Sequence, residues 1–87
     1  MKVKNGFMLR EIAKQWVVIP LGSRVVEFNG IMTLSESGAI LWRLLEKDAT
    51  EDELVAAMLD EYEVDEETAR NDVRLFLGMV QDKNLFE

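Results

Sequence analysis

The fold is decided by a change of pattern within one stretch, Ile31-Met32-Thr33-Leu34-Ser35-Glu36-Ser37-Gly38-Ala39-Ile40-Leu41-Trp42-Arg43-Leu44-Leu45. Its first four residues predict a short strand, and Ser35 can cap a helix that continues through Leu45. Projected at about 100° per residue, the apolar side chains cover most of that helix and leave Arg43 as the main polar position. An apolar surface this broad predicts a central helix contacted from several sides.

The residues before this stretch favour β structure. A mixed run at residues 8–12 and a turn at Ala13-Lys14 lead into residues 15–20, which are rich in β-branched and aromatic side chains. Pro20 should end that strand, because it has no N–H group to donate to a neighbour.

Residues 25–28 are expected to be extended again, and Asn29-Gly30 supplies a tight-turn pair before residues 31–34. Either of these two segments could pair with the second strand. We favour a three-stranded antiparallel sheet closed by residues 31–34.

Two further helices are predicted after residue 45. Thr50 and Glu53 form a capping box, and the helix they begin should bury Leu54, Val55, Met58, Leu59 and Tyr62. Asp65 can cap the last helix, and Asn84 suits a left-handed C-terminal cap. The apolar stripe of this last helix comprises Ala69, Val73, Phe76, Leu77 and Val80.

The predicted order is three strands followed by three helices, which is an α+β fold. Helices packed on one face of a small sheet would bury both apolar surfaces. The 87 residues leave room for one domain, spanning residues 1–87.

The composition argues against an enzyme, because the chain contains no cysteine and no histidine. Disulfides, thiolate or imidazole metal ligands, and Ser-His or Cys-His catalysis are therefore excluded. The acidic residues 60–67 lack the ligand spacing and the glycine of a calcium loop, and are better explained as a solvated turn with acids at helix ends. We expect no catalytic residues, no metal and no cofactor.

The charge is unevenly distributed along the chain. Residues 1–34 hold five Lys or Arg and two Asp or Glu, a net charge of +3. Residues 35–87 hold five basic and fifteen acidic residues, a net charge of −10. The acidic half would repel a phosphate backbone, so duplex binding is not expected. No run approaches the ~20 apolar residues of a membrane span, and without an export signal the cytoplasm is the expected compartment.

The last helix has more apolar surface than one interface needs. Leu75 and Met79 widen its apolar arc to about 200°. The excess could pack against other parts of the domain or border a groove left open for a partner. Asp72 falls on the apolar flank and is expected to pair with a base or cap backbone groups. Arg70 and Arg74 form a basic ledge, in which Glu66 can pair with Arg70.

The short strand at residues 31–34 is a second candidate for binding. A small sheet has two edges, and an open edge can accept a further strand from an extended peptide. The edge could instead be blunted by its brevity and by neighbouring loops.

Three segments together resemble the PqqD-like family. Residues 28–45 resemble the family segment LNetGa-x-x-W-x-LL, and residues 50–54, leading to residues 61–65, match the next part. Residues 72–77, Asp-Val-Arg-Leu-Phe-Leu, resemble the family pattern DV-x-x-FL. Ser35 stands where the family usually has Asn, and Asn84 where it usually has glycine; both replacements keep the capping chemistry.

The resemblance implies a winged-helix-like domain that recognises precursor peptides of ribosomally synthesised, modified products. Family members bind the precursor's leader as an added strand between the third strand and the third helix. They present it to a modifying enzyme, often a radical S-adenosylmethionine protein. In this sequence the implied peptide-binding residues are Ile31, Met32, Thr33, Leu34, Arg70, Val73, Arg74, Phe76, Leu77 and Val80.

We therefore interpret the chain as a non-catalytic peptide chaperone or adaptor. Two alternatives stay open at this point: a winged-helix DNA-binding regulator, and a structural interaction domain without a peptide ligand. The acidic helical half argues against the regulator.

Overall fold

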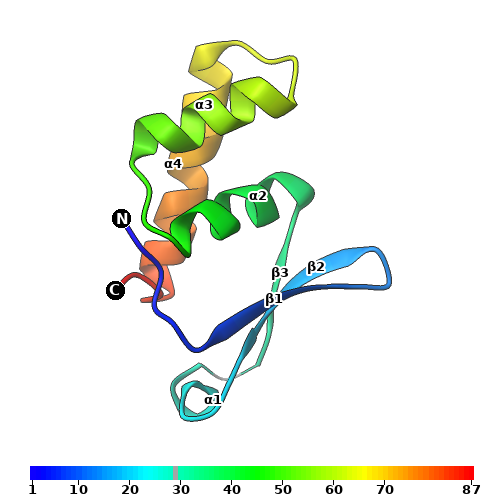
Figure 1. Ribbon diagram of the computed structural model, residues 1–87, viewed down its shortest axis with the longest axis vertical. Coiled ribbons are helices and arrows are strands. Elements are labelled where there is room, and N and C mark those ends of the chain that lie inside the picture. The colour runs from blue at the N-terminus through cyan, green and yellow to red at the C-terminus, as the bar shows by residue number, and fades with distance from the viewer. Residues whose placement is uncertain (29) are drawn as a thin grey trace.

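The computed structural model describes residues 1–28 and 30–87, with three strands and four helices in these parts of the chain. Figure 1 shows the strands at one end of the molecule, with α2 beside them, α3 further away, and α4 running from behind α3 back towards the N-terminal segment. In chain order the elements are β1 (Phe7–Ile12), β2 (Gln15–Pro20), α1 (Arg24–Glu27), β3 (Met32–Leu34), α2 (Glu36–Leu45), α3 (Glu51–Glu61) and α4 (Glu66–Asp82).

The three strands form one antiparallel sheet in the order β1-β2-β3. Val17 of β2 is paired with Thr33 of β3, so the prediction that residues 31–34 close the sheet is confirmed. The turn predicted between β1 and β2 is also present, with φ of 51° at Ala13 and 66° at Lys14. β2 is the central strand, and β1 and β3 are the two edges.

The prediction of an extended segment at residues 25–28 is wrong, because the chain forms the short helix α1 there. Arg24 pairs with Glu27 at 2.7 Å, and the Phe28 N–H donates to the Arg24 carbonyl at 2.8 Å. Val25 is 55% exposed and Val26 is 88% exposed. Their side chains therefore lack the packing against a neighbouring strand that stabilises β-branched residues in sheets. Of the predicted Asn29-Gly30 turn, Asn29 lies outside the described residues and Gly30 has φ of 107°.

The helix starts follow the predicted capping chemistry. The Ser35 hydroxyl accepts from the Gly38 N–H at 3.1 Å, and Thr50 and Glu53 form the complete capping box. The Asp65 carboxylate accepts from the Thr68 N–H at 2.7 Å. Asn84 has φ of 57°, which confirms the left-handed residue after α4.

The core forms around α2, which contacts all three strands and α3. Trp42 and Leu45 are fully buried, as the broad apolar surface of this helix predicts. Leu59 was expected in the core but is 38% exposed. Asp72 is exposed and forms no ion pair or hydrogen bond in the described part of the chain, so its predicted structural pairing is wrong.

The N-terminal segment packs against the end of the chain. Val3 forms an antiparallel bridge with Phe86, and the Lys4 N–H donates to the Leu85 carbonyl at 2.8 Å. This contact ties the first residues to the C-terminal side of α4. Within residues 1–28 and 30–87, none of the helices combines the length and the hydropathy needed to cross a bilayer.

Candidate functional site

β3 presents an open edge of the sheet, since among the described residues β2 is its one strand neighbour. Residues of an edge strand alternately direct their N–H and C=O groups towards the neighbour and away from the sheet. Met32 and Leu34 bury their side chains, whereas Thr33 is exposed and the preceding Ile31 is 60% exposed. The edge therefore offers free backbone groups beside an exposed apolar side chain.

One face of α4 carries a row of side chains that do not belong to its buried stripe. Asp72, Phe76, Met79 and Lys83 are spaced by four, three and four residues and so project within an arc of about 60°. Leu75 lies beside this row and is 74% exposed. Only part of the wide apolar surface of α4 is therefore used in packing.

Gly38, in the first turn of α2, lies between β3 and α4. A Cβ atom added at Gly38 would be 3.3 Å from the Phe76 ring and 3.5 Å from Leu34 Cβ. A cavity of about 300 Å³ opens at this point, lined by Ser35, Ser37, Gly38, Leu41, Met58, Asp72, Leu75 and Phe76. We call the surface formed by β3, Gly38, Leu75 and Phe76 the β3–α4 groove.

The predicted site residues of α4 divide into three groups. Phe76 reaches the groove and Leu77 is half-buried, whereas Val73 and Val80 are fully buried. The last two therefore support the helix from inside the core. Arg70 and Arg74 lie on the other flank of α4, at about 120° to 160° from Phe76 in helical projection.

Both arginines are held by α3 and not by β3. Arg70 Nη1 lies 2.7 Å from Glu51 Oε2 and 3.1 Å from Asp52 Oδ1, and Arg74 Nε lies 3.3 Å from Glu51 Oε1. Hydrogen bonds from Arg74, and to a lesser extent from Arg70, hold the pKa of Glu51 below its ordinary value. The structure thus brings Leu34 and Phe76 together but places the arginine ledge at the α3–α4 contact.

Sequence reasoning missed the part that Gly38 plays. A glycine inside a helix costs about 1 kcal/mol relative to alanine. Its position in a strongly apolar helix is therefore a signal of close approach by a neighbour. The signal does not identify that neighbour, because Phe76 comes from an element 38 residues further along the chain.

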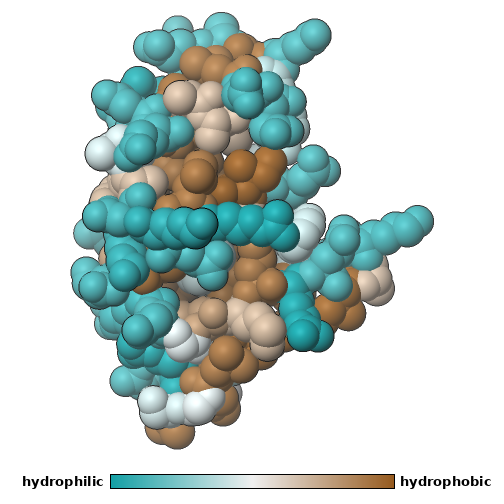
Figure 2. Space-filling view, in the orientation of Figure 1, coloured by the Kyte–Doolittle hydropathy of each residue, from teal (hydrophilic) through white to brown (hydrophobic). Residues whose placement is uncertain are grey.

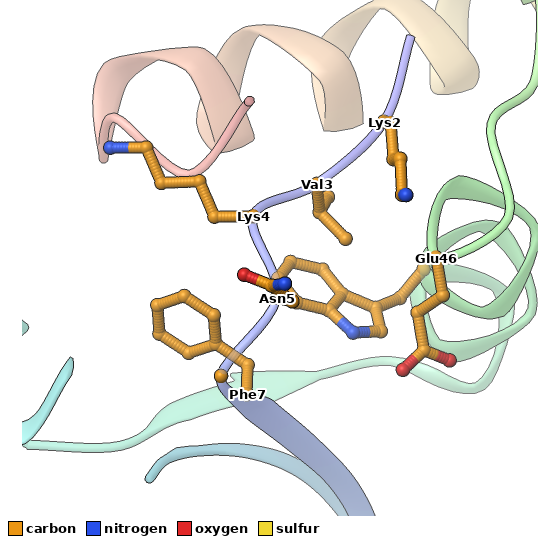
Figure 3. A pocket seen from close by; sticks show the side chains of 8 residues that line it. Lys2, Val3, Lys4, Asn5, Phe7 and Glu46 are labelled. Carbon is orange, nitrogen blue, oxygen red and sulfur yellow. The ribbon is translucent and has the colours of Figure 1, made fainter. Parts of the chain in front are cut away.

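A separate cavity of about 180 Å³ lies between the N-terminal segment and α2 (Figure 3). Lys2, Lys4 and Glu46 surround it, and the indole of Trp42 forms part of its wall. Trp42 Nε1 is buried and has no hydrogen-bond partner among the described residues. The lining of this cavity includes no residue of β3.

No group of three or more Asp or Glu side chains in residues 1–28 and 30–87 converges closely enough to hold a metal ion. The groove itself presents two kinds of surface. It combines backbone donors and acceptors on one side with apolar and aromatic surface on the other.

Comparison with known proteins relates this geometry to a family. The family model for coenzyme PQQ synthesis protein D (PqqD) matches residues 15–85, which is most of the chain and includes both sides of the groove. The chain belongs to the PqqD family. The resemblance seen in the sequence is thereby confirmed. No curated protein matches the sequence.

Two solved structures share this PqqD-family fold along nearly their whole length. TbiB1 in complex with the TbiA(beta) leader peptide has a TM-score of 0.77 and 30% sequence identity, covering 100% of this chain and 95% of its own. Lasso peptide synthetase B1 complexed with the leader peptide has a TM-score of 0.73 and 13% identity, covering 97% of this chain and 93% of its own. The second likeness shows the fold alone.

Proposed function

We propose that this protein is a non-catalytic recognition element that binds the leader of a precursor peptide. The leader adds to the edge of β3 as a further strand and lies in the β3–α4 groove. The observation that carries the proposal is the open edge of β3 together with the approach of Leu34 and Phe76 to each other at Gly38. The 30% identical TbiB1, whose solved structure contains a leader peptide, supports the same ligand class for this chain.

An added strand would use both sides of the groove. Its backbone would pair with the free groups of β3, and alternate side chains would point towards the helices. Leu75 and Phe76 would contact those side chains directly, and Ile31 and Thr33 would contact the peptide from the sheet side. Val73 and Val80 would not contact the peptide. Their buried side chains would fix the position of α4 and so of its exposed surface.

The enzyme that modifies the peptide is proposed to be a separate protein, such as a radical S-adenosylmethionine enzyme. This chain has no cysteine to hold an iron–sulfur cluster and no histidine for acid–base work. Its proposed contribution is to raise the local concentration of the peptide at that enzyme, as linked binding events do.

The proposal can be tested with a random-peptide display library selected on the immobilised protein. A selected peptide is then titrated into the isotope-labelled protein, and backbone amide shifts are followed by NMR. We expect the largest shifts at residues 31–34 and 75–79. Selection of no peptide, or shifts confined to other surfaces, would contradict the proposal.

Strand addition itself can be tested with N-methylated versions of the selected peptide. A methyl group on nitrogen removes a backbone donor without changing the side chains. Because alternate residues of an added strand face β3, N-methylation should weaken binding at every second position. Uniform effects along the peptide would show that it is not bound as a strand.

A further inference from the structure

The row of side chains on α4 that borders the groove ends at Lys83. From Phe76 to Lys83 the helix rises by about 10 Å, and from Leu34 back to Ile31 the extended chain covers about the same length. Phe76 lies near Leu34, and Lys83 lines a cavity together with Phe28, three residues before Ile31. β3 and α4 therefore run in opposite directions, and we call the region where Lys83 and Phe28 meet, beyond the start of β3, the Lys83 end.

The cavity at the Lys83 end has a volume of about 240 Å³ and combines basic with aromatic residues. Lys4, Arg24 and Lys83 line it together with Phe7, Phe28 and Glu27. The rings of Phe7 and Phe28 pack edge to face at 5.7 Å between centroids. Figure 3 shows Lys4 extending away from the neighbouring indole towards the C-terminal end of the chain.

Arg24 is fixed in one position in this cavity. Its Nε donates to the Asn5 carbonyl at 3.0 Å, and its Nη1 donates to Glu27 at 2.7 Å. The guanidinium carbon lies 6.0 Å from the centre of the Phe7 ring. A fixed guanidinium beside two apolar rings is a pre-organised element of a binding site, since little side-chain freedom would be lost on binding.

The cavity is positively charged in a protein whose net charge is −7. Glu27 is the single acidic residue of its lining and is already paired with Arg24. Among residues 1–28 and 30–87, no carboxylate forms an ion pair with Lys4 or Lys83. Lys83 also interacts favourably with the negative C-terminal end of the α4 dipole. The dipole alone does not explain why Lys4 and Arg24, from other parts of the chain, line the same cavity.

We propose that this cavity is an end pocket of the groove that binds an acidic side chain of the peptide. The inference rests on the proposed function and specifies its ligand. An Asp or Glu of the peptide would reach Lys4 and Lys83 with its carboxylate. The peptide residue next to it would cover Phe28. The pocket thereby fixes both the register and the direction of the bound strand, which backbone pairing to three residues of β3 leaves weakly specified.

The test compares peptides selected from the same random-peptide display library by the wild-type protein and by the double variant Lys4→Glu/Lys83→Glu. We expect the wild type to enrich Asp or Glu at one fixed position. The double variant should bind a wild-type-selected peptide roughly tenfold more weakly. Replacing that one acidic residue of the peptide by Lys should restore binding to the variant and abolish it for the wild type.

Lys47→Glu is the matched control, because Lys47 is an exposed lysine beyond the end of α2 and lines none of the cavities at the groove. It makes a charge change of the same sign and should leave the peptide preference unchanged. Lys83→Glu and Lys47→Glu each place a negative charge at or just beyond a helix C-terminus, so both should lose a similar, small amount of stability. Unfolding curves should show every variant fully folded at the temperature of the binding assay.

The outcomes separate this inference from the proposed function. The wild type could select peptides that change the NMR amide shifts of residues 31–34 but show no preference for Asp or Glu. That result would overturn the end pocket and leave the proposed function intact. An equal loss of binding with Lys47→Glu would also overturn the end pocket, because only the overall charge would then matter. Selection of no peptide by the wild type would overturn both.

Discussion

Gly38 of α2 lies against the ring of Phe76 of α4, and a Cβ atom at Gly38 would be 3.3 Å from the Cε1 atom of that ring. The same atom would be 3.3 Å from Ser35 Oγ and 3.5 Å from Leu34 Cβ. The three neighbours leave room for a hydrogen atom. The spacing between β3 and α4, and with it the depth of the groove, therefore depends on a residue that belongs to neither element.

Replacing Gly38 by alanine should move Phe76 and reduce peptide binding without unfolding the protein. The added methyl group crowds the ring, but alanine also favours the helix by about 1 kcal/mol, so the two effects oppose each other. We expect the free energy of unfolding to change by less than about 1 kcal/mol, while affinity for a library-selected peptide falls severalfold. Denaturant unfolding and a binding titration measure the two quantities.

Gly78→Ala is the matched control for this prediction. Gly78 lies inside α4, and apart from the helix backbone around it and its two chain neighbours, no atom lies within 4 Å of a Cβ built there. Without crowding, alanine should raise the free energy of unfolding by about 1 kcal/mol and leave peptide affinity unchanged. A Gly38→Ala variant that gained as much stability as Gly78→Ala, with unchanged affinity, would show that the Phe76 contact does not shape the groove.

Ile31→Asp should weaken peptide binding by at least about tenfold, because it places a charge where the proposed strand would bury an apolar side chain. Ile31 is 60% exposed, so the free protein should keep its stability. Ile12→Asp is the control, since Ile12 is 50% exposed and ends β1, at the opposite edge of the sheet. Equal losses for both variants, measured by fluorescence anisotropy of a labelled peptide, would argue against the β3 edge.

Glu51 should make the α3–α4 contact sensitive to acid. Arg74 and Arg70 lower the pKa of Glu51 in the folded protein, so the charged carboxylate stabilises the fold above its ordinary pKa of 4.5. That contribution is lost as the pH falls through the lowered pKa. Glu51→Gln should therefore reduce stability at pH 7 and flatten the decline of stability below about pH 4.5.

Glu63→Gln provides the comparison, since Glu63 is exposed between α3 and α4 and forms no ion pair with the described residues. Thermal unfolding from pH 3 to pH 7 measures both variants. If Glu63→Gln and Glu51→Gln changed the pH profile equally, the arginine pair would have no special effect.

The turn between β1 and β2 offers a way to stabilise the protein. Ala13 and Lys14 both have positive φ, which non-glycine residues adopt at a cost. Asn-Gly is the preferred pair for such a two-residue hairpin turn. Ala13→Asn with Lys14→Gly should raise the free energy of unfolding by about 1 kcal/mol. Ala13→Val should lower the free energy of unfolding. If denaturant unfolding showed Ala13→Val to be more stable than the Asn-Gly variant, the turn geometry would be contradicted.

Local chemistry made the helix starts predictable from the sequence. Ser35, Thr50 and Asp65 each accept a hydrogen bond from an N–H group three residues later, which needs no knowledge of the rest of the fold. The strand at residues 31–34 was less certain, because the sequence left open whether residues 25–28 or residues 31–34 pair with β2, and the pairing of Val17 with Thr33 decides for the second segment.

Tertiary contacts explain what the sequence did not show. Residues 25–28 have β propensity, but no neighbouring strand is available to reward it, and the Arg24–Glu27 pair favours a helical turn. Arg70 and Arg74 appeared to border the groove because the periodicity of one helix does not reveal which flank meets α3. Their partner Glu51 belongs to another helix, so only packing could place them.

The shortness of β3 has a consequence for how long a peptide would stay bound. A three-residue edge offers free backbone groups at one or two residues, enough for about two to four hydrogen bonds of roughly 1 kcal/mol each. The remaining affinity must come from side chains. For the proposed complex this means that the residence time is set mainly by the side chains that a leader places on the groove, so leaders of different sequence should be released at different rates.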